Sequence, residues 1–513
     1  MLKTQTSSNA TIAGIKFPGV RLNVRTVAGL PLRAAVVYAL LFFVAFCFYD
    51  VLWPSAPLIE PDSGKYLRAA QDLSDFHIDE LQERAPGYPL LLLLSGSSPS
   101  PKRILFFVSL LLHFASIWLL ASVLYRAGLR EVILTLFGLI LLLPPYVEPA
   151  AYVLSDNLAE AMLVAGFVSF VFWILYKRTM WICISALTIG YAALTRPTYQ
   201  LLAFAIAGYF FLANFLFCWT QLNWKDVIRG SLILVCGFMI IVGGYAFFNY
   251  RSFGYFGVTP KLGLTLSTKT VRFVERLPDN YAVIRAALIG ARTAELADGD
   301  HTGTMYIWKV VPELSEITNL RGPELSAYML RLNLLLIQEA PLTYLQEVVW
   351  AFGSYWFPSS AKLANLNSRK LQFFWAVVHF CLIGGFTFNL VLLLGTGIYL
   401  KTCMRLSNMS NRLPVSELRL IYLQACMLGL AGTIVFYTGA VSSLTETGDP
   451  RYRVCTDGLI VFMIFLGTHL WWRLVDVSRT VFSHTQEMSS RDNSQEKDAT
   501  KGYISAPSTK FRC

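Results

Sequence analysis

Apolar runs of about twenty residues recur along almost the whole 513-residue chain, and this pattern limits the possible folds more than any other feature. A helix needs about 20 mostly apolar residues to cross a bilayer. Charged residues make up only 15% of the chain, whereas about 25% is usual in soluble domains. The sequence therefore predicts one all-α membrane body with many spans, not a string of soluble domains.

The runs predict about ten transmembrane helices. They are expected near residues 34–53, 104–125, 132–143, 154–176, 180–194, 199–218, 231–248, 373–400, 420–441 and 454–472. The third run is short because it stops at Pro144-Pro145, and proline cannot continue a helix. We find no internal repeat that would relate two halves of the chain.

These spans divide the chain into five parts. In order, they are an N-terminal segment (1–33), a transmembrane module (34–249) with a first outer loop at 54–100, a polar region (250–370), a second transmembrane module (371–475) and a tail (476–513) that is predicted to be disordered. The polar region contains helix-like segments at 281–297 and 324–339, and the second has an apolar stripe of period 3.6. Residues 341–357 are rich in aromatic side chains, which suits either an interfacial helix or a further half-span.

Basic residues are distributed as the positive-inside rule requires. Five of them, and no acidic residue, precede the first span: Lys3, Lys16, Arg21, Arg25 and Arg33. The N-terminus is therefore expected in the cytoplasm, and an even number of spans returns the C-terminus to the same side. Each inner loop then carries a basic surplus, so the net charge of +11 requires no nucleic-acid partner.

Neither cysteine nor histidine is spaced as a disulfide or metal motif requires. The nine cysteines occur singly, mostly inside apolar runs, and are expected to be small buried hydrophobes. The six histidines form no HExxH pattern. No residue is therefore assigned to a metal, and the need for a divalent cation such as Mg²⁺ or Mn²⁺ stays undecided.

Polar residues that interrupt the apolar pattern gather at the predicted outer ends of the spans. They are Glu60, Asp62, Lys65, Arg84, Asp156, Arg196, Glu446, Asp449, Arg451 and Arg453. Charges deep inside the spans, which an ion or proton relay would need, are expected to be nearly absent. This placement indicates one outward-facing site that is reached partly from the bilayer.

Several of these residues also have simpler explanations. Asp62 could cap the helix that follows Pro61, with Lys65 as an exposed ion-pair partner worth only about 0–1 kcal/mol. Asp156 could complement a helix N-terminus, and Arg196 could extend to the membrane interface. These alternatives require no ligand.

Two basic residues, Arg451 and Arg453, stand on a predicted outer loop against the positive-inside trend, so an anionic partner is expected there. Acids and bases at one face suit glycosyl transfer from a lipid-linked sugar phosphate. A carboxylate would accept the proton of the attacking hydroxyl, and Lys or Arg would stabilise the departing phosphate. We find no P-loop, GxSxG or GxGxxG motif in a strand–helix setting that would support another chemistry.

Five short motifs carry a resemblance to a known enzyme family. They are Asp62-Ser63-Gly64-Lys65-Tyr66, Arg84-Ala85-Pro86-Gly87-Tyr88-Pro89-Leu90, Leu154-Ser155-Asp156-Asn157-Leu158, Ala193-Leu194-Thr195-Arg196-Pro197-Thr198 and Asp449-Pro450-Arg451-Tyr452-Arg453. In their order and outer-face placement they resemble the loops of the GT-C glycosyltransferases. The closest likeness is to the branch that uses polyprenyl-phosphate sugars, which includes protein O-mannosyltransferases and aminoarabinose transferases of lipid A. The resemblance covers most of residues 34–475.

The resemblance implies a GT-C-like fold and a role for each matching residue. Asp62 would be the general base or a key acid of the acceptor site, and Asp156 would be its positioning partner. Lys65 and Arg84 would hold the donor phosphate. Further site candidates from the same motifs are the phosphate-binding residues Arg196, Arg451 and Arg453, and the aromatic residues Tyr66 and Tyr88.

The first motif departs from the family pattern. Many relatives have Asp-Glu there, whereas Ser63 follows Asp62 in this chain, which leaves Glu60 as the second acid. The enzyme would take a sugar from a polyprenyl-phosphate donor and pass it to a hydroxyl on a glycolipid, a glycan or a protein. Its site would face the extracytoplasmic side of a bacterial-type inner membrane, with the bilayer as a further partner.

Two other classes of protein compete with this hypothesis. A transporter or flippase of a lipid-linked saccharide would need mid-membrane charges or broken helices, and pseudo-symmetric halves. A non-catalytic scaffold would not need its outer-face acids and bases to converge. Separation of Asp62 from Lys65, Arg84 and Asp156 by more than about 10 Å would favour the scaffold, because catalysis requires near hydrogen-bond reach.

Overall fold

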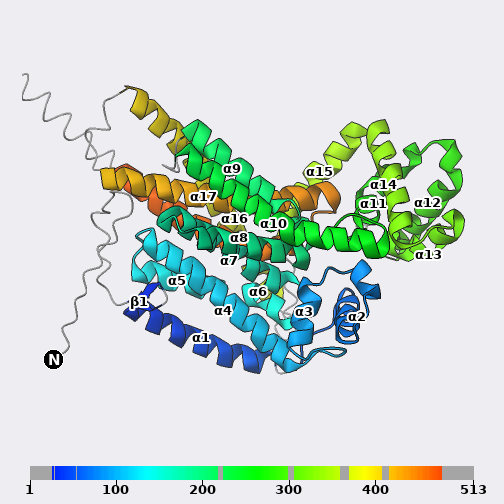
Figure 1. The fold of residues 1–513 in the computed structure, drawn as a ribbon, viewed down its shortest axis with the longest axis horizontal. Coiled ribbons are helices and arrows are strands. Elements are labelled where there is room, and N and C mark those ends of the chain that lie inside the picture. Colours follow the sequence, from blue (N-terminus) through cyan, green and yellow to red (C-terminus); the bar gives the residue numbers. More distant parts are fainter. Residues whose placement is uncertain are drawn as a thin grey trace, which may run out of the picture.

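The described residues of the computed structural model are almost entirely helical (Figure 1). The structure describes residues 26–27, 29–53, 55–217, 223–298, 306–358, 369–406 and 415–476. In this part of the chain the strands are limited to a short antiparallel pair, β1 (Thr26–Val27) and β2 (Leu30–Pro31), in which Thr26 faces Pro31. The predicted all-α class is therefore confirmed. The predicted tail and most of the N-terminal segment lie outside the described residues.

Eight helices of the described part are long and apolar enough to cross a membrane. They comprise α1 (Leu32–Leu52), α4 (Arg103–Arg126), α7 (Asp156–Tyr176), the segment Pro197–Phe215 that includes most of α9 (Leu202–Phe217), α10 (Trp224–Phe253), α16 (Arg369–Leu406), α17 (Val415–Thr445) and a last helix over 454–476. The polytopic membrane prediction is confirmed by these helices.

The expectation of about ten spans exceeds this count for two physical reasons. α5 (Glu131–Leu141) stops before Pro144-Pro145, and the chain then bends by 66° into the segment Pro144–Ala151. This bent pair gives a ninth crossing only if it is counted as one span. α8 (Thr179–Thr195) is apolar but has only 17 residues, fewer than the roughly 20 that a bilayer needs.

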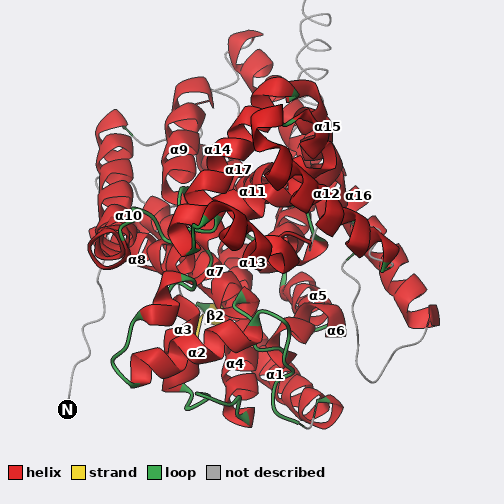
Figure 2. Cartoon of the chain, turned by 90° about the vertical axis from the view of Figure 1, so that its right-hand side faces the viewer, coloured by secondary structure: helices red, strands yellow, loops and turns green. Residues whose placement is uncertain are grey.

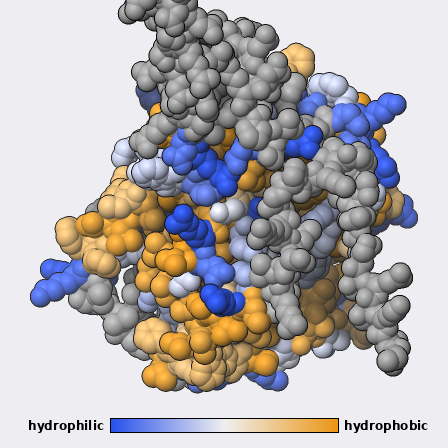
Figure 3. All heavy atoms as spheres, turned by 90° about the vertical axis from the view of Figure 1, so that its left-hand side faces the viewer, coloured by the Kyte–Doolittle hydropathy of each residue, from blue (hydrophilic) through white to orange (hydrophobic). Residues whose placement is uncertain are grey.

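α7 is the central helix of the membrane bundle. It packs on α8 and α4, and 83% of its apolar window is buried, against 22% for α1. Outer helices instead expose large apolar side chains such as Phe43, Ile240 and Phe373. Such a surface is expected where lipid takes the place of water. The end that carries β1, seen in Figure 3, has polar side chains bordered by broad apolar areas.

A second helical unit with its own apolar core lies at the opposite end of the bundle, beside α2 (Ser63–Ser74) and α3 (Gly87–Leu94) (Figures 1 and 2). It consists of α11 (Leu262–Thr270), η4 (Val271–Arg276), α12 (Ala282–Ala297), α13 (Tyr306–Thr318) and α14 (Gly322–Glu339). α12 and α14 are the two helices expected in the polar region. α11 meets α14 closely at Gly263, where a β-carbon would collide with the carbonyl of Ser326.

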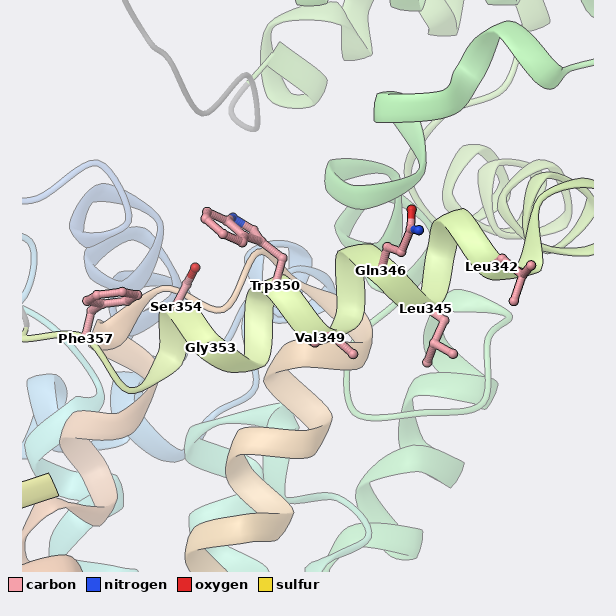
Figure 4. A pocket seen from close by; sticks show the side chains of 8 residues that line it. All are labelled: Leu342, Leu345, Gln346, Val349, Trp350, Gly353, Ser354 and Phe357. Carbon is pink, nitrogen blue, oxygen red and sulfur yellow. The ribbon is translucent and has the colours of Figure 1, made fainter. Parts of the chain in front are cut away.

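α15 (Pro341–Tyr355) connects this unit to the membrane bundle. Its buried side chains Ala351 and Tyr355 face the bundle, while Val349 and Trp350 are exposed. The exposed side borders an apolar groove of about 490 Å³, and Figure 4 shows the lining side chains arranged along the helix. α15 has 15 residues, whereas a helix needs about 20 to cross a bilayer, so α15 is not an additional span.

Candidate functional site

Five charged residues from separate segments meet at the end of the bundle that carries α2 and α3. Asp62 precedes α2, Arg84 precedes α3, and Asp156 begins α7. Arg196 follows α8, and Arg451 lies in the short helix η7 (Pro450–Arg453). Four of the five have a proline within two residues in the chain. Proline interrupts or starts helices, so these side chains are placed at helix ends, where they can turn toward one another.

The five residues form one continuous ion-pair network. Arg84 donates from Nη2 to Oδ1 of Asp62 at 2.5 Å, and Arg196 is paired with Asp156. Arg451 lies between the two aspartates: its Nη1 is 3.7 Å from Oδ2 of Asp62, and its Nη2 is 3.5 Å from Oδ2 of Asp156. The separation that would favour a scaffold is therefore not observed for Asp62 and these arginines.

Asp62 is the acid of this network that a ligand can reach. Its side chain is 44% exposed, whereas that of Asp156 is 3% exposed. Asp62 stands at the N-cap position of α2, but its carboxylate makes no capping hydrogen bond. Partial burial acts to raise the pKa of the Asp62 carboxyl, but the charges of Arg84 and Arg451 outweigh it and hold the pKa below its usual value.

Aromatic side chains fix the orientation of the arginines. The guanidinium of Arg84 lies 4.6 Å from the ring centre of Tyr66, and that of Arg196 lies 5.3 Å from the ring centre of Tyr452. The hydroxyl of Tyr66 is 3.2 Å from Oγ of Ser155, so Tyr66 also links α2 to the start of α7. Tyr88 packs edge-on against Tyr66 at 5.0 Å.

Lys65 does not pair with Asp62 but with Glu83, at 2.5 Å. The same oxygen of Glu83 lies 3.2 Å from Nζ of Lys261, which sequence analysis did not identify. Burial works against ionisation of Glu83, but Lys261 and Lys65 lower its pKa to about 2. Burial and the charge of Arg84 lower the pKa of Lys261 to about 8. A basic residue directly after Pro260, on a predicted outer segment, was the available signal for Lys261.

Glu446 is a further acidic residue near the network. The sequence predicted its place at the outer face but no role for it. Burial raises the pKa of its carboxyl, opposed by a hydrogen bond with Tyr452 and by the charge of Arg196. Tyr452 therefore joins Glu446 to the network through the ring that Arg196 covers.

Four buried atoms of this cluster have no hydrogen-bond partner. Two are donors, Nε of Arg84 and Nε of Arg451, and two are acceptors, Oδ2 of Asp156 and Oε2 of Glu446. A buried polar atom without a partner costs about 1–3 kcal/mol. A ligand with acceptor oxygens and hydroxyl donors would offer the types of partner that these atoms lack.

Two predicted site residues have other partners. Arg453 is 1% exposed, pairs with Asp457 at 2.8 Å and donates to the carbonyls of Tyr355 and Phe357 at 2.8 and 2.6 Å. Its bonds hold the end of α15. The backbone N–H of Glu60 donates to Oγ of Ser63 at 2.8 Å, and its carboxylate lies close enough to Glu148 for the two charges to interact.

The arrangement suits an anion better than a divalent cation. In the described residues we find no group of three His, Cys, Asp or Glu side chains placed to hold a metal ion. The space between Asp62 and Asp156 is also occupied by the guanidinium of Arg451, which takes carboxylate oxygens that a cation would need.

Three solved structures match this chain, each at low sequence identity and with a TM-score below 0.5. The archaeal oligosaccharyltransferase AglB from Archaeoglobus fulgidus, solved with an inhibitory peptide and a dolichol-phosphate, matches with a TM-score of 0.47 and 12% identity over 88% of this chain and 52% of its own. The apo form of the Archaeoglobus fulgidus oligosaccharyltransferase matches with a TM-score of 0.46 and 13% identity over the same shares. ArnT from Cupriavidus metallidurans, bound to undecaprenyl phosphate, matches with a TM-score of 0.33 and 15% identity over 85% of this chain and 78% of its own.

These similarities describe an arrangement of helices and no more. The chain spans about half the length of the archaeal oligosaccharyltransferase, 52%. No family model matches the sequence, and no curated protein is significantly similar to it. Its activity therefore has to be inferred from the residues of the site.

Proposed function

We propose that this protein is a membrane glycosyltransferase that moves a sugar from a polyprenyl-phosphate donor to an acceptor hydroxyl at the extracytoplasmic face. The observation that carries the proposal is the network of Asp62 with Arg84 and Arg451. It combines one reachable carboxylate with buried guanidinium N–H groups that have no acceptor. The carboxylate suits a ligand hydroxyl, and the guanidinium N–H groups suit a phosphate ester.

The charge balance of the cluster also favours an anionic ligand. Five basic residues surround it: Lys65, Arg84, Arg196, Lys261 and Arg451. Four carboxylates accompany them: Asp62, Glu83, Asp156 and Glu446, of which Glu446 has a raised pKa. The cluster therefore keeps a positive surplus even if every acid is ionised. A single phosphate ester would neutralise that surplus.

The proposed reaction uses these residues in two ways. The acceptor oxygen attacks the anomeric carbon of the sugar while the bond from that carbon to the phosphate oxygen breaks. The carboxylate of Asp62 takes the proton of the acceptor hydroxyl. The phosphate leaves with the bonding electron pair, and its added charge is stabilised by Arg84, Arg451 and Lys261.

Donor binding would also make Asp62 a stronger base. In the free protein Arg84 and Arg451 lower its pKa. If these arginines turn their charge toward a bound phosphate, their hold on the carboxylate weakens and its pKa moves toward the usual value. The base would then gain proton affinity at the step that requires it.

The groove along α15 is the proposed place for part of the polyprenyl chain. Its lining is mostly apolar, and the end of α15 is bonded to Arg453, two residues from Arg451. A carboxylate in the groove would have to lose its water to contact the apolar chain, whereas a short-chain phosphate has no chain to place there. We expect Val349→Glu to weaken binding of undecaprenyl phosphate and to leave binding of a soluble alkyl phosphate unchanged; equal affinities for undecaprenyl phosphate would contradict this placement.

The decisive experiment is Asp62→Asn with labelled polyprenyl-phosphate sugars and full-length protein, in the absence of any ion gradient. Wild type should release polyprenyl phosphate from the donor, which a transporter or flippase would not do. The variant should fold and bind donor but transfer sugar about 10²–10⁴-fold more slowly, the usual contribution of a general base. Asp75→Asn, an exposed aspartate at the other end of α2, is the matched control. Full transfer activity in Asp62→Asn would remove Asp62 from the mechanism.

The phosphate assignment has its own test. Lys65→Ala and Arg84→Ala should mainly weaken binding of undecaprenyl phosphate, because each removes one cation from the proposed phosphate site. Unchanged affinity in both variants would refute the assignment while leaving the role of Asp62 untouched.

A further inference from the structure

A buried polar pair lies inside the bundle, one helical turn deeper than the site. His113 of α4 and Glu160 of α7 are 1% and 4% exposed, and Nδ1 of His113 is 3.2 Å from Oε2 of Glu160. Glu160 follows Asp156 by four residues on α7, so the two lie on one face about 6 Å apart along the axis. Ionisable groups inside a membrane bundle are costly and usually functional. From the sequence, almost no ionisable groups were expected deep inside the spans, and this pair was missed.

The sequence explains why a histidine is needed here. In a continuing helix the carbonyl of Leu141, the last residue of α5, would accept from the N–H of residue 145, but Pro145 has none. Nε2 of His113 lies 2.9 Å from that carbonyl oxygen. An unpaired carbonyl inside a bilayer costs several kcal/mol. His113 therefore supplies the donor that Pro145 lacks.

This bond also fixes the proton count of the pair. A carbonyl oxygen only accepts, so Nε2 of His113 carries hydrogen. A neutral ring of that kind would turn the lone pair of Nδ1 toward Glu160, which a carboxylate would repel. One further proton must therefore lie between Nδ1 and Oε2, on either group. The pair is electrically neutral overall in both cases, which suits a structural role inside the membrane.

The pair joins the elements that carry the site. Beside it, Nδ2 of Asn157 on α7 donates to the carbonyl of Ser109 on α4 at 2.9 Å, so α4 and α7 are linked by two polar contacts one turn apart. The last helix meets Glu160 at Gly458, where a β-carbon would lie only 3.2 Å from Oε1 of Glu160. That helix begins directly after Arg453, so α7 and the segment carrying Arg451 close on the same carboxyl group.

We infer that His113 and Glu160 are positioning residues for the site. They hold the first turn of α7 against α4 and against the end of α5, and thereby fix Asp156. Asp156 in turn holds Arg196 and Arg451 for the phosphate. This inference rests on the proposed function, because phosphate binding is its readout.

The test uses full-length protein in nanodiscs, undecaprenyl phosphate as the probe, and two measurements, Kd and Tm. In His113→Leu/Glu160→Leu, apolar side chains replace the pair, but the carbonyl of Leu141 loses its donor, so Tm should fall. At a temperature well below that Tm we expect a Kd about tenfold higher than that of wild type, since a tenfold change corresponds to about 1.4 kcal/mol of lost positioning. A Kd equal to that of wild type would overturn the inference alone, whatever the Tm.

A conservative variant decides the matter if the double variant fails to fold. The amide of His113→Gln can still donate to Leu141 and contact Glu160, so its Kd should stay within about threefold of wild type, less than one neutral hydrogen bond is usually worth. A tenfold loss in His113→Gln would overturn the inference. Gln424→Leu is the matched control, because Gln424 is a buried donor to the carbonyl of Ala127 at the other end of α4, and its Kd should be unchanged. Failure of wild type itself to bind undecaprenyl phosphate would overturn the proposed function, and this inference with it.

Discussion

Two buried polar clusters lie at the same end of the molecule, and they differ in how completely their atoms are paired. In the cluster between α11 and α14, the Asn333 amide nitrogen is 2.6 Å from the Gly263 carbonyl oxygen and 3.1 Å from the Ser267 hydroxyl. Its carbonyl oxygen accepts from Thr270 at 2.6 Å. In the site cluster, Arg84, Asp156, Glu446 and Arg451 each have a buried polar atom without a partner.

The difference separates a cluster whose polar atoms are paired within the fold from one that keeps open polar atoms. A fully paired polar cluster holds two helices in one register and gains nothing from further partners. An incompletely paired cluster lowers stability by about 1–3 kcal/mol for each open group. Such atoms also occur elsewhere in the described residues, but most of the charged side chains that have one belong to the site cluster, which favours a bound state in which a ligand completes them.

The largest expected effect separates the two arginines of η7. Arg451→Met removes the cation shared by Asp62 and Asp156, so transfer and binding of undecaprenyl phosphate should each fall by about 100-fold, as expected when a charged hydrogen-bond donor to the phosphate is lost. Arg453→Met breaks the bonds to Asp457 and α15 and should instead lower Tm. Kd and Tm of the two variants measured side by side test this. Similar losses of affinity in both would show that Arg453 also belongs to the phosphate site.

This pair of arginines also shows what the sequence could and could not predict. Apolar run length and proline placement were sufficient for the all-helical membrane fold, because burial in lipid depends on composition along a single segment. The short motifs placed Asp62, Arg84, Asp156, Arg196 and Arg451 at one end of the bundle. They could not distinguish Arg451 from Arg453, because both belong to one motif and only the packing of α15 decides which one is sequestered.

Contacts between residues that share no motif could not be predicted from the sequence for a similar reason. Lys261 reaches Glu83 across 178 positions of the chain, and no periodicity links two such segments. His113 lies in an apolar run, and no motif marks it. Its role depends on the missing N–H of Pro145 in another helix, which becomes visible only when α4 and α5 are seen together.

The paired cluster gives the next prediction. Asn333→Leu keeps the side-chain size but removes all the hydrogen bonds of the amide, so unfolding should become easier by about 1–3 kcal/mol. The Kd for undecaprenyl phosphate should be unchanged, because the amide's recorded bonds lie within α11 and α14. Thermal unfolding in detergent and ligand titration measure the two effects. A change in Kd without a change in Tm would contradict the division between the two clusters.

The pH dependence of undecaprenyl phosphate binding tests whether the basic residues of the site cluster contact the phosphate. Lys261 has a pKa of about 8 in the free protein, and only its protonated form attracts a phosphate. Affinity for undecaprenyl phosphate should therefore be full below about pH 7 and fall by up to about tenfold as pH rises through 8 toward 9.5, a window in which the phosphate itself is already ionised. Lys261→Arg should remove this fall, because arginine stays protonated. Identical profiles in wild type and Lys261→Arg would exclude Lys261 from phosphate binding.

The smallest expected effect concerns a buried acceptor atom to which a bound phosphate could not donate a hydrogen bond. Oε2 of Glu446 is buried and unpartnered, and Tyr452 holds the same carboxyl group beside Arg196. A sugar hydroxyl could complete it, whereas a bare phosphate could not. Glu446→Leu should leave Kd for undecaprenyl phosphate unchanged and weaken binding of a sugar-bearing donor by about fivefold, the value of one neutral hydrogen bond. Glu339→Gln, an exposed acid at the end of α14, is the control. An equal loss of affinity for both ligands would place Glu446 at the phosphate and not at the sugar. A sugar hydroxyl would then not be the donor to Oε2 of Glu446.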